Sequence, residues 1–206
     1  MLAILCYAAA GWAGKLYLHH HKKLRSAQRQ SLLAIMRAYR TTSNSALTVL
    51  AAEPPIHLVH RKRVAYYYLR KNHEFPIGNI HYTPSTQPIT ENNTTTIKNG
   101  IRGETIKTWQ SEWDTFERGG VTRAFFRNIS KRMQLVITGI SHNAAQILTG
   151  HGRIKSTLHR LKLSESDQCR CGQLDTVEHI VYHCKGDVAE RKGLQEKIRG
   201  ECVAWP

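Results

Sequence analysis

Three cysteines and one histidine that stand close together constrain the fold more than any other feature of this sequence. Cys169, Cys171, His179 and Cys184 follow the spacing C-x-C-x7-H-x4-C. Three thiolates and one imidazole are a ligand set of structural zinc sites, in which four protein ligands leave no coordination position open. Gly172, directly after the first pair, has the backbone freedom that a tight turn needs. The spacing therefore predicts a small zinc knuckle that organises the fold and does not activate water.

Two other interpretations of these residues stay open at the level of sequence. His183, directly before Cys184, is an alternative fourth ligand in place of His179. A metal-free interpretation has two buried thiols, a third thiol placed by chance and a surface histidine. Outside the group we expect Cys6 to be a small buried apolar residue and Cys202 to be a thiol in the tail. Five cysteines in 206 residues are too few, and odd in number, for a disulfide scaffold.

The chain is strongly basic, which points to a polyanionic partner. It carries 30 Lys and Arg against 15 Asp and Glu, a formal net charge of +15. Residues 1–100 hold 13 of the basic residues and only 3 acidic ones, so the positive field is strongest there. Such a field favours nucleic acid first and an acidic membrane surface second. We predict phosphate contacts from the basic helices and from the knuckle, through Lys22, Lys23, Arg25, Arg29, Arg61, Lys62, Arg63 and Arg170.

The sequence contains none of the residue patterns typical of hydrolytic or phosphoryl-transfer sites. Only four residues are Asp, and no two carboxylates are adjacent, whereas a two-metal site needs clustered carboxylates. A phosphate-binding loop that ends in Gly-Lys-Ser/Thr and a His-Glu-x-x-His helix are both missing from the sequence. We therefore assign no catalytic residue to this chain.

Apolar periodicity predicts a mostly α-helical fold with little strand. Apolar residues recur at intervals of three and four, the period of one helix face, in segments that Pro or Gly residues separate. Trp109 and Trp113 lie four residues apart and are predicted core residues. The expected helices cover residues 22–39, 46–52 and 56–71, a stretch from residue 105, and residues 128–148, 154–161 and 189–200.

A change of composition divides the chain. Residues 75–99 contain three prolines and the polar run Glu-Asn-Asn-Thr-Thr-Thr, the pattern of an exposed linker. We therefore expect a basic helical region over 1–74, a second helical region over 100–164, and a zinc-knuckle module with a tail over 165–206. The apolar run 1–13 is shorter than the roughly 20 residues that cross a bilayer. We expect a buried helix or strand there, with an interfacial segment as the alternative.

Four short motifs, in this order along the chain, resemble one known family. They are AYRTTSNSALTVLAAEPPI at 38–56, TWQSEW at 108–113, LTGHG at 148–152 and CRCGQLDTVEHIVYHC at 169–184. Together they resemble the C-terminal portion of the Pol polyprotein of non-LTR retrotransposons, most closely the type-1 elements that insert into ribosomal RNA genes. The resemblance covers the chain from about Leu2 to Cys184.

The resemblance implies a role in target-primed reverse transcription, in which nicked genomic DNA primes the copying of element RNA. In such polyproteins an endonuclease and a reverse transcriptase precede a region of this kind. The polymerase Asp-Asp motif and the acid/His set of the endonuclease have no match here, so no catalytic residue is carried over. Magnesium is expected only in the polymerase region, outside this chain.

The resemblance further implies element RNA and target DNA as partners, no membrane partner, and a nuclear location after cytoplasmic synthesis. The basic helices would lie in the polymerase thumb or just beyond it. A different class of function is a stand-alone, zinc-dependent nucleic-acid-binding adaptor without enzymatic activity. A third class, more distant, is a basic peripheral membrane protein that is anchored by residues 1–13.

Overall fold

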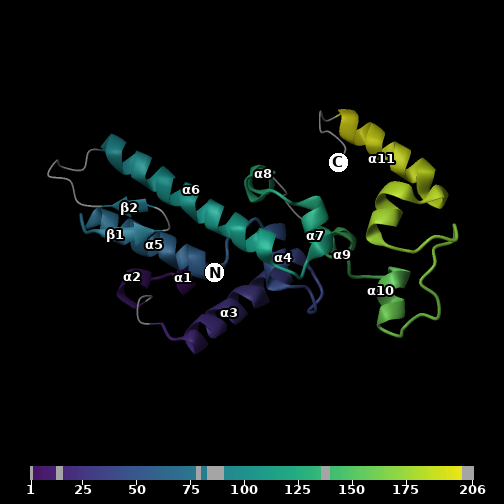
Figure 1. Cartoon of the computed structure of the whole chain (residues 1–206), viewed down its shortest axis with the longest axis horizontal. Coiled ribbons are helices and arrows are strands. Elements are labelled where there is room, and N and C mark those ends of the chain that lie inside the picture. The colour runs from purple at the N-terminus through teal and green to yellow at the C-terminus, as the bar shows by residue number, and fades with distance from the viewer. Residues whose placement is uncertain (1, 13–15, 78–79, 83–90, 136–139, 201–206) are drawn as a thin grey trace.

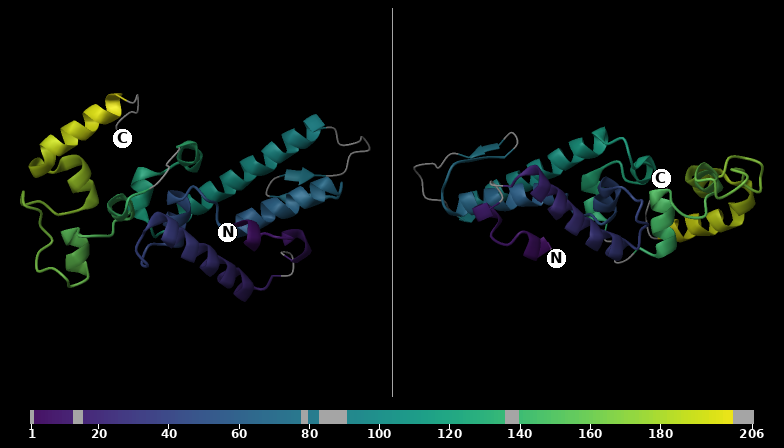
Figure 2. Two further views of the ribbon diagram at one scale, coloured as in Figure 1. Left: turned by 180° about the vertical axis from the view of Figure 1, so that it is seen from behind. Right: turned by 90° about the horizontal axis from the view of Figure 1, so that it is seen from below.

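The computed structural model describes residues 2–12, 16–77, 80–82, 91–135 and 140–200. These residues form an elongated, mostly helical molecule (Figure 1), and the same extended shape is seen from behind and from below (Figure 2). The elements begin with α1 (Leu2–Leu5), α2 (Ala9–Trp12), α3 (Leu18–Met36), α4 (Asn44–Leu50), α5 (Ile56–Arg70), β1 (Phe75–Ile77) and β2 (Ile80–Tyr82). They continue with α6 (Glu91–Thr115), α7 (Gly120–Phe125), α8 (Ile129–Gln134), α9 (His142–Thr149), α10 (Lys155–Arg160), the π-helical turn η2 (His179–His183), the 3-10 turn η3 (Lys185–Asp187) and α11 (Val188–Gly200).

Local capping chemistry explains where the helices in the middle of the chain begin and end. The Ser43 hydroxyl accepts a hydrogen bond from the Ala46 amide at the start of α4, and Ser141 caps α9 in the same way through Ala144. Helix α9 ends at Gly150, whose φ of +70° is a left-handed conformation that suits glycine. These caps confirm helices close to the predicted ones, but the segment predicted over 128–148 contains two helices, α8 and α9.

The core is built from both sides of the predicted division of the chain. In one cluster Leu32 of α3 and Leu47 of α4 pack with Ala145 of α9. In a second, Trp109 and Trp113 of α6 pack against a group that also contains Val49, Leu58 and Ile129. The two tryptophans are 2% and 1% exposed, so their predicted burial is confirmed. Residues 1–74 and 100–164 therefore share one core.

The predicted linker over residues 75–99 is wrong where the structure describes this stretch. Strands β1 and β2 pair as an antiparallel hairpin, and residues 91–99 already belong to α6. Ile97 and Ile101 of α6 pack against Ala65 and Leu69 of α5, so tertiary packing outweighs the poor helix propensity of the Asn and Thr run. Pro76 is tolerated because a two-stranded hairpin has only edge strands. Residues 78–79 and 83–90 lie outside the described residues.

The apolar start of the chain forms two short helices, α1 and α2, beside α5. Cys6 and Ala9 are buried, and Cys6 packs with Ile56 and Val59. Ile4 and Tyr7 are exposed by 79% and 80%. The predicted burial of this segment is therefore confirmed for the side that carries Cys6 and Ala9 and is wrong for the side that carries Ile4 and Tyr7. In the part of the chain that the structure covers, every helix is too short or too polar to cross a membrane.

Candidate metal centre

The first two cysteines of the predicted knuckle lie on a tight turn. Gln168 and Leu174 form an isolated antiparallel bridge, and the Cys169 amide donates to the Gln173 carbonyl at 2.7 Å. Gly172 reverses the chain with a φ of +83°, a value that L-residues adopt only with strain. The backbone therefore holds the two thiols of Cys169 and Cys171 on one side of the turn, as the sequence spacing predicted.

The other two residues come from a turn that follows shortly after. The His179 amide is bonded to the Thr176 hydroxyl at 3.1 Å, and the Cys184 amide donates to the His179 carbonyl at 2.7 Å. The π-helical turn η2 between them brings His179 and Cys184 to the same side, and both are buried. The structure thus brings together the four residues that the spacing singled out.

The donor atoms lie close enough together to surround one zinc ion. One potential ligand atom from each of the four residues lies within 4.8 Å of the others. The sulfurs of Cys169 and Cys184 are 3.6 Å apart, and Cys171 Sγ lies 3.2 Å from His179 Nε2. Zinc–sulfur bonds of about 2.3 Å and zinc–nitrogen bonds of about 2.0 Å at tetrahedral angles give a sulfur–sulfur distance of about 3.8 Å and a sulfur–nitrogen distance of about 3.5 Å. The donor set therefore fits zinc, with Nε2 as the nitrogen ligand of His179.

The alternative ligand His183 does not join this group. Its side chain is exposed, and its ring lies beside that of Tyr182, whereas His179 is 6% exposed. The structure therefore selects His179 over His183.

The thiols of Cys184 and Cys171 differ in the direction of their pKa shifts. Burial raises the pKa of Cys184 to about 11, whereas a hydrogen bond from the Gln173 backbone lowers the pKa of Cys171. A bound metal ion would hold all three as thiolates, because a coordinated thiol loses its proton.

Residues outside the predicted ligand set hold the knuckle in place, and sequence reasoning missed them. Arg191 of α11 donates to the carbonyl oxygens of Ile180 and Cys184. Asp175 Oδ2 accepts a hydrogen bond from the Lys155 amide at 2.7 Å and so joins the knuckle to α10. Asp175 and Arg191 belong to no recognisable sequence motif, so only their positions in the structure show that they hold the knuckle in place.

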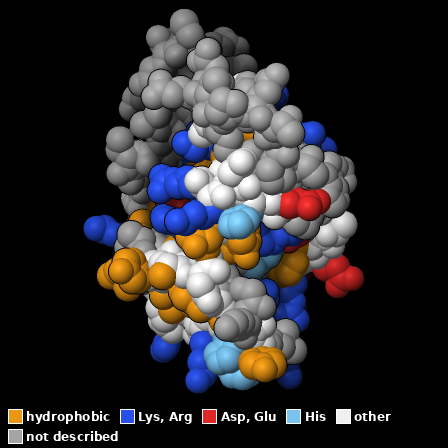
Figure 3. Space-filling view, turned by 90° about the vertical axis from the view of Figure 1, so that its left-hand side faces the viewer, with side chains coloured by type: hydrophobic (Ala, Val, Ile, Leu, Met, Phe, Trp, Pro, Cys, Tyr) orange, Lys and Arg blue, Asp and Glu red, His pale blue; other side chains and the backbone are white. Residues whose placement is uncertain are grey.

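The predicted phosphate-contacting residues of α3 and α5 have different environments. Lys22, Lys23 and Arg25 of α3 and Arg61 and Arg63 of α5 are exposed. Figure 3, which views the molecule from the hairpin end, shows many Lys and Arg side chains on the described part of this face and few acidic ones.

Three of the residues predicted to contact phosphates interact with other residues of this chain. Lys62 is half-buried, and its pKa is lowered by burial and by the charges of Arg102 and Arg63. Arg170 forms a 2.9 Å ion pair with Asp187 but stays 76% exposed.

Arg29 is the third engaged residue. It donates to the Thr42 carbonyl at 2.7 Å and to Asn44 Oδ1 at 2.6 Å, and also to the Arg40 carbonyl. It thereby holds the turn between α3 and α4, a structural role that the charge pattern did not reveal.

Comparison with known proteins identifies clear relatives. The chain is 33% identical over 198 residues to a protein described as "Retrovirus-related Pol polyprotein from type-1 retrotransposable element R1 4" of Nasonia vitripennis; the match covers 95% of this chain and 49% of that protein. It is 29% identical over 185 residues to the "Putative 115 kDa protein in type-1 retrotransposable element R1DM" of Drosophila melanogaster, covering 87% of this chain and 18% of the relative. It is 26% identical over 191 residues to an R1 Pol polyprotein of Bradysia coprophila, covering 89% and 18%.

The chain therefore spans half or less of the length of these relatives. No family model matches it, and no solved structure does.

Proposed function

The chain is a homologue of the Pol polyproteins of type-1 R1 retrotransposable elements, and we propose that it serves as a nucleic-acid-binding part of such a polyprotein. The observation that carries this proposal is the convergence of Cys169, Cys171, His179 and Cys184 in a chain with a net charge of +15. A closed zinc site in the same chain as exposed basic side chains is suited to binding a polyanion.

In this proposal a zinc ion cross-links two parts of the chain and takes no part in a reaction. The four ligands hold the turn of Cys169–Cys171 against η2, and Arg170 between the two cysteines is thereby presented to solvent. Phosphates are contacted by the exposed cations of α3 and α5, with release of counterions. Binding should therefore weaken strongly as salt increases.

The partners that we propose are element RNA and target DNA, in target-primed reverse transcription in the nucleus. The polymerase and endonuclease activities belong to the whole polyprotein, with magnesium in its polymerase region. We assign no catalytic residue to the part described here, and we propose that it is inactive alone.

Salt-dependent binding tests the proposal. The affinity of the purified chain for labelled single-stranded RNA should fall linearly with the logarithm of salt concentration, by a slope of about 0.7 for each phosphate contact. Replacing Lys22 and Lys23 by Gln should lower the slope by about 1.4. A matched control removes two exposed charges elsewhere, Lys131→Gln with Arg153→Gln. A wild-type slope near zero, or equal effects of both double variants, would contradict the proposal.

A further inference from the structure

A hollow between α3, α4, α5 and the end of α6 contains Arg25, one of the exposed cations of α3, and its other lining residues have no role in the function proposed above. Its volume is about 660 Å³, within the range of about 300–1,000 Å³ that holds small-molecule ligands. Three arginines line it, Arg25, Arg29 and Arg118, against one carboxylate, Glu112. The hollow is therefore positively charged.

The single carboxylate is already paired. Glu112 Oε1 lies 2.8 Å from Nε2 of His57. Arg25 and Arg118 have no ion-pair partner among the residues that the structure describes. An anion that enters the hollow therefore meets guanidinium groups that no acidic side chain neutralises.

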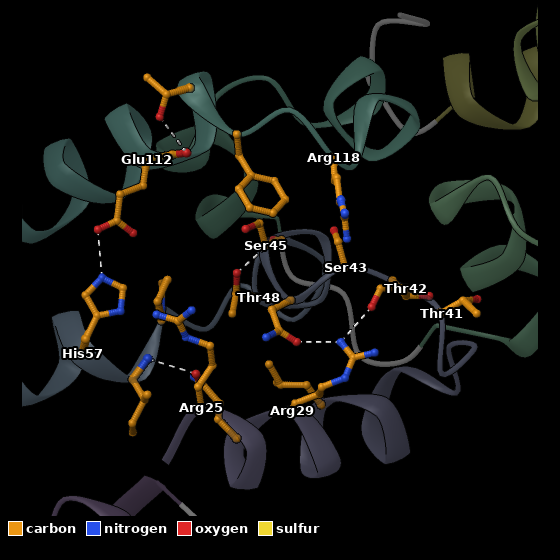
Figure 4. Close-up of a pocket in the computed structure, with 17 residues that line it drawn as sticks. Arg25, Arg29, Thr41, Thr42, Ser43, Ser45, Thr48, His57, Glu112 and Arg118 are labelled. Carbon is orange, nitrogen blue, oxygen red and sulfur yellow. Dashed lines mark hydrogen bonds and ion pairs between the residues drawn. The ribbon is translucent and has the colours of Figure 1, made fainter. Parts of the chain in front are cut away.

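Two of the arginines lie at one end of the hollow. Figure 4 shows Arg118 pointing from the segment after α6 toward Ser43, with Arg29 of α3 opposite it, whereas Arg25 of α3 points toward the side of His57. Arg25 and Arg29 are one turn apart and so share a helix face.

Arg29 is fixed in place by its bonds to the turn that follows α3. Of the five N–H donors of a guanidinium, it uses three, for the acceptors of Thr42, Asn44 and Arg40. Its two other donors have no hydrogen-bond partner among the residues that the structure describes. Because the side chain is already ordered, little side-chain entropy is lost when an anion binds to it.

The other end of the hollow differs in chemistry. Figure 4 places His57 and Glu112 together on the side away from Arg118, and Phe116 also lines the wall. An aromatic ring offers a stacking surface for a base, and the paired imidazole and carboxylate offer hydrogen-bonding atoms for a base edge. A lone phosphate would leave most of this space empty.

We propose that this hollow binds one nucleotide unit of a single-stranded nucleic acid. The phosphate lies between Arg29 and Arg118, the base lies against Phe116 and toward the His57–Glu112 pair, and Arg25 contacts the neighbouring phosphate of the strand. This inference rests on the proposed function and goes beyond it, because it assigns a pocket to one unstacked nucleotide where α3 and α5 supply only general backbone contacts.

The test is a fluorescence anisotropy titration of the full chain with a labelled single-stranded oligonucleotide. Arg25→Gln with Arg118→Gln should weaken binding about 10-fold, because charge-assisted contacts are lost, and should lower the salt slope by about 1.4. The control, Lys131→Gln with Arg153→Gln, removes the same charge from exposed sites and should change affinity less than twofold. Arg29 is left intact because its loss would disturb the fold.

Two further arms separate the phosphate from the base. Adenosine monophosphate should compete with the oligonucleotide at lower concentration than inorganic phosphate does. Phe116→Leu keeps an apolar wall and should reduce competition by the nucleotide but not by inorganic phosphate.

The outcomes separate this inference from the proposed function. If the wild type binds with a salt slope but the Arg25/Arg118 variant equals the control, the nucleotide pocket is wrong and the proposed function stands. If the wild type binds no oligonucleotide at low salt, the proposed function is wrong. NMR with adenosine monophosphate then decides the pocket by itself. Shifted Nε–H signals of Arg25 and Arg118 support it, and unchanged signals overturn it.

Discussion

Removal of zinc should unfold the knuckle and leave the helical core folded. Within residues 165–187 the only buried aliphatic side chain is Val177, whose burial contributes about 1.5–3 kcal/mol. Structural zinc in comparable small modules contributes about 10 kcal/mol or more. Bound zinc would thus be the largest stabilising term in this segment, whereas none of the four candidate ligands lies in the core around Trp109 and Trp113.

Hydrogen exchange measured by mass spectrometry, before and after chelation, locates the effect. The amides of Cys169, Gly172 and Cys184, which are hydrogen-bonded within the knuckle, should lose protection after chelation, while amides of α6 should keep it. Thiol titration should count three newly reactive cysteines.

A matched pair of variants tests the same reasoning. His179→Gln should abolish stoichiometric zinc binding, and His183→Gln should retain it, because His183 lies outside the ligand group. Equal zinc contents in the two variants, or unchanged protection of the knuckle after chelation, would refute the argument.

Three further predictions concern the helical core. Gly150→Ala should lower the free energy of unfolding in urea by about 2 kcal/mol. A Cβ at this position would lie 2.7 Å from Val121 Cγ2, and the residue has a left-handed φ of +70°. The double variant Gly150→Ala with Val121→Ala should recover part of the lost stability. Trp113→Phe should cost about 2 kcal/mol, since the indole N–H donates to the Phe126 carbonyl at 2.8 Å, and an unchanged urea midpoint would contradict this. Burial lowers the pKa of His60 below its ordinary value of 6.5. The buried neutral ring therefore stabilises the fold above pH 6.5, and this stabilisation is lost as the pH falls below that value. The melting temperature should be lower at about pH 5.5 than at about pH 7.5, and the difference should be smaller in His60→Asn.

The convergence of the four candidate zinc ligands and most helices could be predicted because their signals are local. The C-x-C-x7-H-x4-C spacing singled out four residues that converge in the structure, and the four motifs placed the chain in the family that its relatives confirm. The choice between His179 and His183 needed the structure, because both are close enough in sequence to Cys184. Only the π-helical turn η2 decides which imidazole points inward.

The segment over residues 75–99 could not be predicted because its signals are not local. Prolines and a run of Asn and Thr are typical of a linker, but Ile97 and Ile101 are buried by α5, which lies far earlier in the sequence. Helix α6 therefore begins at Glu91 and runs to Thr115 without the periodicity that a short window would detect. Packing partners that are remote in sequence decide such a case.

The arginines show why net charge predicts a partner but not the residues that bind it. Arg132 is 4% exposed, donates to the Leu50 and Leu135 carbonyls, and lies over the ring of Phe126. Arg123 likewise donates to a carbonyl and lies over Trp113. These guanidiniums stabilise the fold through neutral acceptors, so no carboxylate cancels their charge. Arg132 is buried and cannot contact a phosphate, whereas Arg123 is half-buried. We therefore propose that attraction for a polyanion is a property of the whole helical region, whereas contacts depend on exposed cations such as Arg25.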